Sequence, residues 1–253
     1  MATHEQPARS FDRVAGTYAR ARPGYPAAAL DWLLPAGARR VLDLGAGTGK
    51  LTASLLDRGL EVTALEPSPQ MLAELRRELG DRPRLRALEG SAESIPLADA
   101  SVDAVLVAQA WHWVDPARAV PEVARVLAPG GRIGLVWNRR DERSPWAAAL
   151  GRIVVQPAAR TSADDPRVGA PFGPPERFDT DPWIEEMTPD RLLEMVTTRS
   201  YVIVQRPAAR EALLGRVREL LRDHPDLAGR ERIEMVYVTE CVRADLPAGQ
   251  ARR

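Results

Sequence analysis

The sequence is poor in cysteine and has no long apolar run. Cys241 is the only cysteine among the 253 residues, so an intrachain disulfide is impossible and a reducing compartment fits the chain. No segment approaches the roughly 18 uninterrupted apolar residues of a membrane span, and residues 1–20 lack the apolar core of a signal peptide. We therefore expect a cytoplasmic protein without a membrane partner.

An excess of charge of either sign is also missing. Lysine plus arginine and aspartate plus glutamate each total 35, and Lys50 is the only lysine. Proteins that bind a phosphate backbone usually carry a basic excess, so a nucleic-acid partner is not expected. The three histidines, His4, His112 and His224, are far apart in the sequence, and no metal site is expected.

The middle of the chain alternates between short apolar segments and helical segments. Strands separated by helices pair in parallel through right-handed crossovers. The pattern therefore predicts an α/β protein with an open, mostly parallel sheet and helices on both faces. Strands are expected at 40–44, 60–65, 85–88, 102–108 and 132–137, and helices through 55–56, at 69–79 with Ser68 as N-cap, and at 116–127.

The segments on either side of this alternation are less regular. Two helices are expected before it, at 11–20 and 26–34. After it, the sequence indicates a helix at 146–155, an irregular loop or lid at 157–183, an extended segment at 201–204, a helix at 208–221 and a strand at 233–242.

A glycine-rich turn follows the first strand, in the segment Asp43-Leu44-Gly45-Ala46-Gly47-Thr48-Gly49. Glycines let the backbone turn tightly and approach a ligand closely. A dinucleotide-binding loop would need a glycine at position 50, where Lys50 stands. A Walker loop would need a glycine in place of Leu44, so both phosphate-binding registers fail.

This segment resembles the D/E-x-G-x-G-x-G motif of class I S-adenosylmethionine-dependent methyltransferases. The resemblance implies a Rossmann-like sheet with an antiparallel C-terminal strand, and S-adenosylmethionine as the cofactor. It places Gly45, Ala46, Gly47 and Gly49 against the methionine portion of the cofactor, whose amino group Asp43 positions.

Further segments match the family in its order along the chain. Glu66-Pro67 ends the second strand, where a carboxylate accepts hydrogen bonds from both ribose hydroxyls. The turn after the third strand holds Ala92 and Glu93, which the resemblance places at the adenine edge. Gln109 ends the fourth strand and is also expected at the cofactor.

Ligands of open α/β sheets bind beyond the carboxyl ends of the strands, which directs attention to residues 109–113 and 137–140. Trp111, Trp113 and Trp137 either wall a substrate pocket or fill gaps between sheet and helices. His112 acts as a general base, hydrogen-bonds a backbone carbonyl, or contacts the substrate without moving a proton. Arg139, together with Arg22 and Arg140, offers guanidinium groups to a carboxylate substrate.

The N-terminal residues resemble those of a small-molecule branch of the family that includes trans-aconitate methyltransferase-like proteins. The matching pattern is Phe11-Asp12-x-x-Ala15-x-x-Tyr18 followed by Arg22-Pro23-x-Tyr25-Pro26. The resemblance implies that Tyr18 and Arg22 contact the cofactor and that Tyr25 contacts the substrate. Helix packing followed by a turn is the alternative explanation of the same residues.

Together these features predict one methyltransferase domain over 1–253, acting on a small metabolite or natural-product intermediate at O, N or C. Its expected parts are a helical cap (1–37), a cofactor-binding core (38–138), a substrate-region insertion or lid (139–205) and a C-terminal helix and strand (206–253). The alternatives are a nucleic-acid methyltransferase and a non-catalytic regulatory protein that binds the cofactor. The first lacks the Asn/Asp-Pro-Pro-aromatic segment after the fourth strand, where Gln109-Ala110-Trp111-His112 stands.

Overall fold

The computed structural model describes residues 22–154, 165–199, 202 and 205–249. Its helices are α3 (Ala27–Leu33), α4 (Lys50–Asp57), α5 (Pro69–Leu79), α6 (Pro116–Val126), α7 (Pro145–Ile153), α8 (Pro189–Thr197) and α10 (Pro207–Asp223), with the 3-10 turn η2 (Trp111–Trp113). Its strands are β1 (Arg40–Leu44), β2 (Glu61–Glu66), β3 (Leu85–Glu89), β4 (Val102–Ala108), β5 (Leu127–Arg140), β6 (Glu176–Asp179), β7 (Trp183–Met187) and β8 (Ile233–Asp245).

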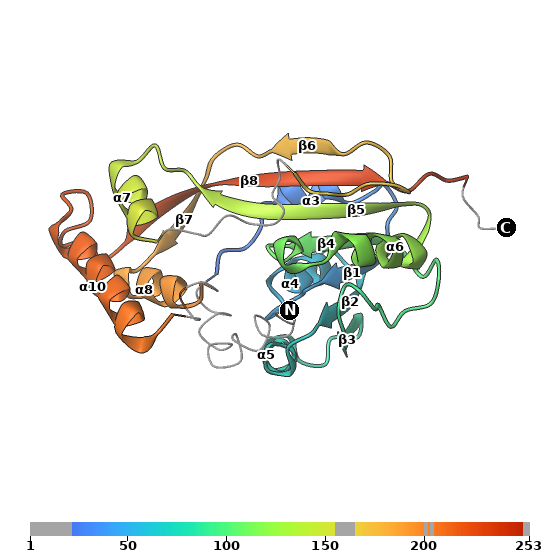
Figure 1. Ribbon diagram of the computed structural model, residues 1–253, viewed down its shortest axis with the longest axis horizontal. Coiled ribbons are helices and arrows are strands. Elements are labelled where there is room, and N and C mark those ends of the chain that lie inside the picture. Colours follow the sequence, from blue (N-terminus) through green and yellow to red (C-terminus); the bar gives the residue numbers. More distant parts are fainter. Residues whose placement is uncertain (1–21, 155–164, 200–201, 203–204, 250–253) are drawn as a thin grey trace.

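The strands form one mixed sheet in the order β3-β2-β1-β4-β5-β8-β6, with β7 also paired to β8 (Figure 1). β1 to β5 run parallel to their neighbours, whereas β8 is antiparallel to β5, and β6 and β7 are antiparallel to β8. The predicted open sheet with an antiparallel C-terminal strand is confirmed. No helix in the described ranges is both long and apolar enough to cross a membrane.

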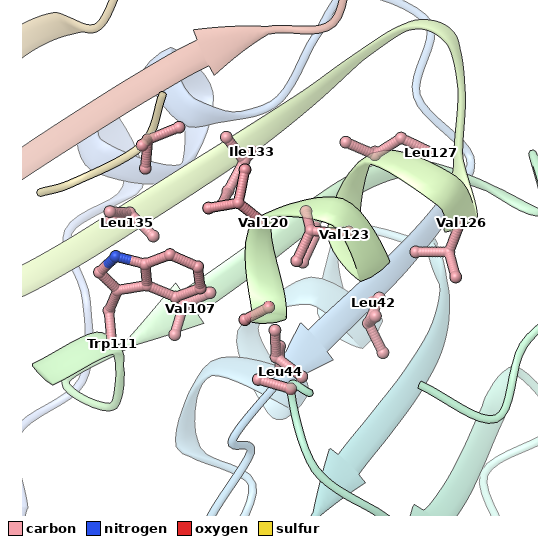
Figure 2. Close-up of a cluster of buried hydrophobic side chains, with 14 of the residues drawn as sticks. Leu42, Leu44, Val107, Trp111, Val120, Val123, Val126, Leu127, Ile133 and Leu135 are labelled. Atoms are coloured by element: carbon pink, nitrogen blue, oxygen red, sulfur yellow. The ribbon is translucent and has the colours of Figure 1, made fainter. Parts of the chain in front are cut away.

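The parallel strands are covered by helices on both faces because their side chains alternate between two cores. Leu42 and Val105 point into a core closed by α6, which Figure 2 shows in close-up. Val41 and Ala104, one residue away in each strand, point into the opposite core, which α3 and α4 close. The helices on both faces that the sequence predicts are therefore present.

β5 and β8 extend past the parallel strands and carry a second cluster of helices at one end of the molecule (Figure 1). This cluster, made of α7, α8, α10 and β7, has its own buried residues, among them Leu150, Met195 and Val217. Tyr237 of β8 belongs to it and is 1% exposed. We call this part of the molecule the terminal cluster.

Several expected segments differ in the structure. Residues 176–179 form β6 instead of continuing the irregular loop predicted at 157–183, and β7 begins at the last residue of that range. β6 has three exposed residues out of four and pairs with β8 as an outer strand, so its sequence shows no apolar alternation. Val202, expected in an extended segment, is helical and buried. The helix predicted at 11–20 lies outside the described residues.

Residues 129–131, which precede the strand predicted at 132–137, lie inside β5, and their conformation depends on a glycine. The pairing of β4 with β5 shifts in register between Val102 and Ala104, where Gly131 lies close to its neighbours. A Cβ at Gly131 would lie 2.8 Å from the carbonyl oxygen of Ala128 and 3.1 Å from that of Asp103. Both are backbone atoms within the sheet, so they cannot move aside as a side chain can.

Gly131→Ala is expected to lower the free energy of unfolding by about 1–3 kcal/mol, because the added methyl group overfills this site. Urea denaturation measures the change. Gly215→Ala in α10 is the matched control, since no atom lies within 4 Å of the new Cβ. The control should keep the stability of the parent or gain up to about 1 kcal/mol from helix propensity. Equal stability of both variants would contradict the crowding argument.

Candidate functional site

The glycine-rich loop begins where β1 ends and folds over the end of β2. The backbone N–H groups of Gly45 and Ala46 both donate to the carbonyl of Leu65, at 2.8 and 3.1 Å. Gly45 has a φ of 73°, which favours glycine. A Cβ at Gly45 would also lie 2.7 Å from the Cβ of Ala110, so the residue after β1 must be a glycine for two independent reasons.

Glu66 ties the end of β2 to this loop. One carboxylate oxygen accepts from the N–H of Gly47 at 2.8 Å, and the other accepts from the N–H of Ser68 at 3.0 Å. The side chain of Ser68 in turn accepts from the N–H of Met71 and caps α5 as predicted. Glu66 is only 7% exposed, so its carboxylate is a fixed group beside the loop.

Asp43 lies beneath the loop with no exposed surface. One of its oxygens accepts from the hydroxyl of Thr52 at 2.6 Å, while Oδ1 has no hydrogen-bond partner. Burial raises the pKa of Asp43 to about 7, and the nearby charge of Glu66 acts in the same direction against the Thr52 hydrogen bond. A buried oxygen of this kind is costly unless a ligand donates to it.

A cavity opens at the carboxyl ends of β1 and β4, directly above the glycine loop. This is the edge where open α/β sheets bind ligands. Its far side is formed by Tyr237 of the terminal cluster and by the chain that leads into α3. The lining residues are Arg22, Pro23, Tyr25, Gly45, Ala46, Gly47, Thr48, Lys50, Leu51, Ala108, Gln109, Asn138, Arg199 and Tyr237.

The segment before α3 is held against the cavity by Asn138 near the end of β5. The Asn138 amide donates to the carbonyl of Gly24 at 2.8 Å and accepts from the hydroxyl of Thr239 at 2.7 Å. Trp183 of β7 donates to the same hydroxyl at 2.9 Å. Arg22 donates to the carbonyl of Thr198 at 3.1 Å, so this segment bridges the sheet and the terminal cluster.

Most of the glycine-loop residues predicted to bind the cofactor therefore line the cavity, and so do two of the N-terminal residues predicted at the site. Arg22 and Tyr25 line it with Gly45, Ala46 and Gly47, and Gln109 lies on the same wall. Gln109 has a φ of 57° at the end of β4, an unusual conformation for a residue other than glycine and one that is common near ligands. Gly49 caps the start of α4. Tyr18 lies outside the described residues.

The three tryptophans proposed as pocket walls lie elsewhere. Trp111 is completely buried, packs in the core beneath α6 (Figure 2), and donates from its indole nitrogen to the carbonyl of Pro166 at 2.6 Å. Trp113 is 41% exposed. Trp137 is half-buried and packs against the core of Trp111. Trp111 and Trp137 are therefore placed as packing residues, which was the alternative to a role as walls of a substrate pocket.

His112 lies next to the site, although the described residues that line the cavity do not include it. Its ring packs on Trp113 with the ring centres 4.8 Å apart. Burial, assisted by the positive charge of Arg22, lowers the pKa of His112 to about 4. The imidazole is therefore neutral at physiological pH. Arg139 points away from the cavity and pairs with Glu240, leaving 65% of its side chain exposed.

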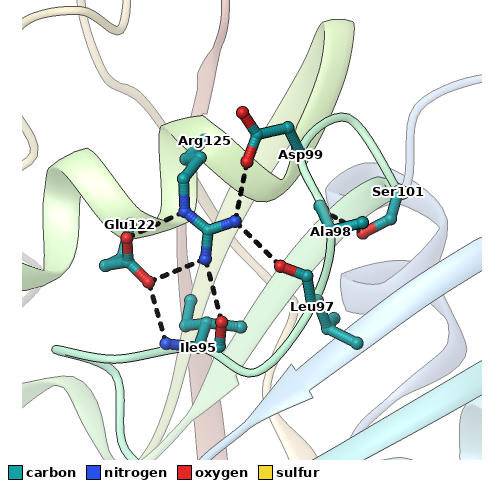
Figure 3. A network of polar contacts seen from close by, with 7 residues as sticks. All are labelled: Ile95, Leu97, Ala98, Asp99, Ser101, Glu122 and Arg125. Atoms are coloured by element: carbon teal, nitrogen blue, oxygen red, sulfur yellow. Dashed lines mark hydrogen bonds and ion pairs between the residues drawn. The ribbon is translucent and has the colours of Figure 1, made fainter.

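The turn that follows β3 is anchored by a network of ionic contacts (Figure 3). Arg125 of α6 contacts the carboxylates of Glu122 and Asp99 and donates to the carbonyls of Ile95 and Leu97. The N–H of Ile95 donates to Glu122 in return. These contacts fix the loop after the turn, and the network lies on the surface side of α6.

The predicted adenine-edge residues lie in that turn. Ala92 is 7% exposed, and the Glu93 carboxylate accepts from the N–H of Asp115 at 3.0 Å, just before α6. Pro67, predicted beside the ribose, is exposed. None of these three is among the described residues that line the cavity, which places the cavity at the loop end of the expected cofactor site.

Five polar residues of the cavity wall were not predicted as site residues: Thr48, Lys50, Asn138, Arg199 and Tyr237. Thr48 and Lys50 are part of the glycine loop and its helix, so their position in the motif was an available signal. Arg199 and Tyr237 belong to the terminal cluster, for which the sequence offers no motif.

The site fits the amino-acid portion of S-adenosylmethionine. Asp43 Oδ1 and the hydroxyl of Thr48 are buried oxygens without a hydrogen-bond partner, and both lie at the loop that the resemblance assigns to this portion. Gly45 and Gly47 both have positive φ values, which favour glycine, and both line the cavity. Within the described ranges, no three His, Cys, Asp or Glu side chains gather as metal ligands.

Known proteins with similar sequences and folds are methyltransferases. The methyltransferase domain family matches residues 42–135. An uncharacterized methyltransferase of Mycobacterium tuberculosis is 54% identical over 237 residues, covering 94% of this chain and 96% of that protein. A solved structure from Anaeromyxobacter dehalogenans, assigned as a type II methyltransferase, has a TM-score of 0.64 at 26% identity and covers 89% of this chain and 99% of its own.

A phosphoethanolamine N-methyltransferase of Haemonchus contortus, solved with S-adenosyl-L-methionine, shares the fold at 17% identity. Its TM-score is 0.53, over 93% of this chain and 57% of that chain. The sheet order and the glycine loop after β1 are those of the class I S-adenosylmethionine-dependent methyltransferases. By the identity and coverage of its mycobacterial relative, this chain belongs to the methyltransferase family.

The buried carboxyl of Asp43 predicts a pH-dependent stability. Its pKa in the folded state, about 7, is above its ordinary value of 3.8, so the folded chain binds the proton more tightly than the unfolded chain. The contribution of Asp43 to stability is therefore present below pH about 4 and is lost as the pH rises to about 7. Relative to the parent, Asp43→Asn should gain stability between pH 5 and pH 8, measured by urea denaturation without cofactor.

Asp103→Asn is the control for this experiment. The Asp103 carboxylate accepts from the N–H groups of Arg39 and Arg40 and pairs with the Arg40 guanidinium. These contacts hold the pKa of Asp103 below its ordinary value, so it is ionised at both pH values. Its substitution should change the stability by the same amount at each pH. A pH-independent effect of Asp43→Asn would contradict the raised pKa.

Proposed function

We propose that this methyltransferase binds S-adenosylmethionine on the glycine loop and methylates a small metabolite or natural-product intermediate at O, N or C. The observation that carries the proposal is the shared position of the loop, the two buried carboxyls and the cavity. Glu66 accepts from the N–H of Gly47 in the loop, Asp43 is buried in the strand that leads into the loop, and the loop residues Gly45, Ala46 and Gly47 line the cavity. The fold neighbour from Haemonchus contortus, solved with the same cofactor, supports the choice of ligand.

Each carboxyl has a distinct part in this proposal. Asp43 Oδ1 and the Thr48 hydroxyl accept and position the amino group of the cofactor. Glu66 accepts from the ribose hydroxyls, because its carboxylate is held beside the loop by Gly47 and Ser68 and a carboxylate is a pure acceptor. Arg22 pairs with the carboxylate of the cofactor, because its fork of donors suits a carboxylate.

When bound, the cofactor supplies an electrophilic methyl group: a bond from the acceptor atom to the methyl carbon forms while the carbon–sulfur bond breaks, and its electron pair returns to sulfur. The protein contributes alignment and exclusion of water. Tyr25, Gln109 and Tyr237 surround the space where an acceptor would lie. An acceptor atom that is already ionised needs no base, whereas a protonated one must release its proton during transfer.

Glu66→Ala is expected to weaken S-adenosylmethionine binding by roughly tenfold or more, because hydrogen bonds to a charged group are lost. Isothermal titration calorimetry measures the affinity. Glu61→Ala is the matched control: this carboxylate is exposed at the opposite end of β2. Glu66→Gln separates the loss of charge from the loss of the side chain. Unchanged affinity in both Glu66 variants, or a preference for NAD, would contradict the assignment.

His112 is expected to have little part in proton transfer. A general base contributes roughly 100-fold to 10,000-fold to the rate, and it must reach the acceptor. His112→Gln should therefore change kcat by less than tenfold, since the described cavity wall does not include the imidazole. Initial rates of product formation over a range of pH measure this. A loss of 100-fold or more, together with the loss of an inflection near pH 4, would establish a base role instead.

The experiment that tests the whole proposal is transfer of a labelled methyl group. The protein is incubated with methyl-labelled S-adenosylmethionine and a protein-free cell extract, and labelled products are identified by mass spectrometry. A labelled small molecule that disappears in Glu66→Ala supports the proposal. Labelling of RNA or DNA alone, or cofactor binding without any transfer, would contradict it.

A further inference from the structure

Residues 22–25 form part of the cavity wall without belonging to a helix or a strand. Arg22, Pro23 and Tyr25 line the cavity, and Gly24 lies between them in the chain. Pro23 has no N–H group to donate to a backbone ladder. Contacts from other elements therefore decide where these residues lie, and we call them the wall segment.

A row of side chains across three neighbouring strands leads to the wall segment. Asn138 of β5 lies opposite Thr239 of β8, and Trp183 of β7 lies opposite Tyr237, two residues earlier in β8 (Figure 1). The indole of Trp183 donates to the Thr239 hydroxyl at 2.9 Å, and this hydroxyl donates to Oδ1 of Asn138 at 2.7 Å. The row ends at the wall segment, where Nδ2 of Asn138 donates to the carbonyl of Gly24 at 2.8 Å.

The direction of these hydrogen bonds is fixed at both ends of the row. The Gly24 carbonyl only accepts, so the end of the Asn138 amide that faces it must be the NH2 group, and Oδ1 must face Thr239. The indole N–H of Trp183 only donates, so Thr239 Oγ1 accepts there and gives its own hydrogen to Asn138. Trp183 and Thr239 therefore determine which end of the Asn138 amide reaches the wall segment.

The middle of the row is buried. Thr239 has no exposed surface, and Asn138 is 9% exposed. The backbone N–H of Thr239 is bound at 3.1 Å by the hydroxyl of Thr180, which is also buried. Removing one member of a buried row leaves its neighbours without a partner, which is costly, so each contact supports the next. The row therefore holds the wall segment more firmly than a single exposed hydrogen bond would.

The row also connects the two sides of the cavity. Asn138 lines the cavity together with the wall segment and with Gly45 and Gly47 of the glycine loop, whereas Thr239 and Trp183 are not among the described lining residues. The ring of Trp183 stacks on Tyr237, which does line the cavity, with the ring centres 5.2 Å apart. The terminal cluster thus forms one wall directly and reaches another through Asn138.

We infer that Asn138 is a positioning residue for the cofactor: it holds the wall segment at the cavity beside the glycine loop, and Thr239 and Trp183 act through it. This inference rests on the proposed function, in which the cavity takes the amino-acid portion of S-adenosylmethionine. Without the Asn138 amide, the Gly24 carbonyl loses its partner and turns toward water, so the cavity opens on that side. The amino-acid portion then binds more weakly, whereas the nucleoside portion at Glu66 is unaffected.

Calorimetry with two nucleosides separates positioning from a general loss of structure. S-adenosylhomocysteine contains the amino-acid portion, and 5′-methylthioadenosine lacks it. Asn138→Ala should weaken S-adenosylhomocysteine about tenfold or more, because a hydrogen bond is lost and its buried partners are left unsatisfied. The same variant should keep the parental affinity for 5′-methylthioadenosine. A general loss of structure would weaken both ligands.

Thr239 tests whether the effect passes along the row. Thr239→Val keeps the shape of the side chain but removes the hydroxyl, and it should weaken S-adenosylhomocysteine about fivefold or more. Thr239→Ser should restore the parental affinity. Combining Thr239→Val with Asn138→Ala should weaken binding no further than Asn138→Ala alone, since both act through one contact. Thr63→Val, the same exchange at a half-buried position of β2, is the control and should leave both affinities unchanged.

Three results would overturn the inference: a parental affinity for S-adenosylhomocysteine in Asn138→Ala, an equal loss of both nucleosides, or effects of the two exchanges that add in the combined variant. If Asn138→Ala does not fold, the comparison of Thr239→Val with Thr239→Ser decides, and equal affinities in these two variants would overturn the inference. Failure of the parent protein to bind S-adenosylhomocysteine would instead contradict the proposed function itself.

Discussion

The turn after β1 determines the position of every other part of the site. Its first two N–H groups are bound by the carbonyl of Leu65, and a third is bound by Glu66, so the ends of two neighbouring strands are joined at one edge. Because Gly45 lies against Ala110 without room for a Cβ, the chain that leaves β4 is held by the same turn. Three strand ends are thus fixed before any ligand binds, which is the preorganisation that positioning requires.

The burial of polar groups at this turn lowers the stability of the protein when no ligand is bound. Asp43 is fully buried with one oxygen unsatisfied, and its raised pKa expresses the cost of holding a charge there. Natural sites keep such groups when a ligand satisfies them, at the expense of stability in the free protein. The proposed cofactor accounts for Asp43 better than the fold does, since Thr52 alone does not compensate for its burial.

The sequence predicts the parallel strands, α7, α10 and β8 well, but it misses β6 and the residues by which the terminal cluster reaches the cavity. The β1-to-β5 strands are apolar and separated by helices, so both their existence and their order follow from local patterns. β6 is exposed at the outer edge, and no periodicity marks it. The tryptophans illustrate the same limit at the site: only the folded chain shows that Trp111 packs in the core whereas Arg199 and Tyr237 reach the cavity.

The long β5–β8 ribbon has a consequence for the assembly of the site. Its register places Tyr237 opposite Arg140, while Arg22 bridges to Thr198 from the other end of the described chain. The cavity wall therefore combines residues more than 200 positions apart, although the glycine loop is built from neighbours. During synthesis the loop and its strands can form early, but the cavity exists only after β8 has been made and paired. A folding intermediate that lacks β8 would hold the cofactor loop without a wall to select the acceptor.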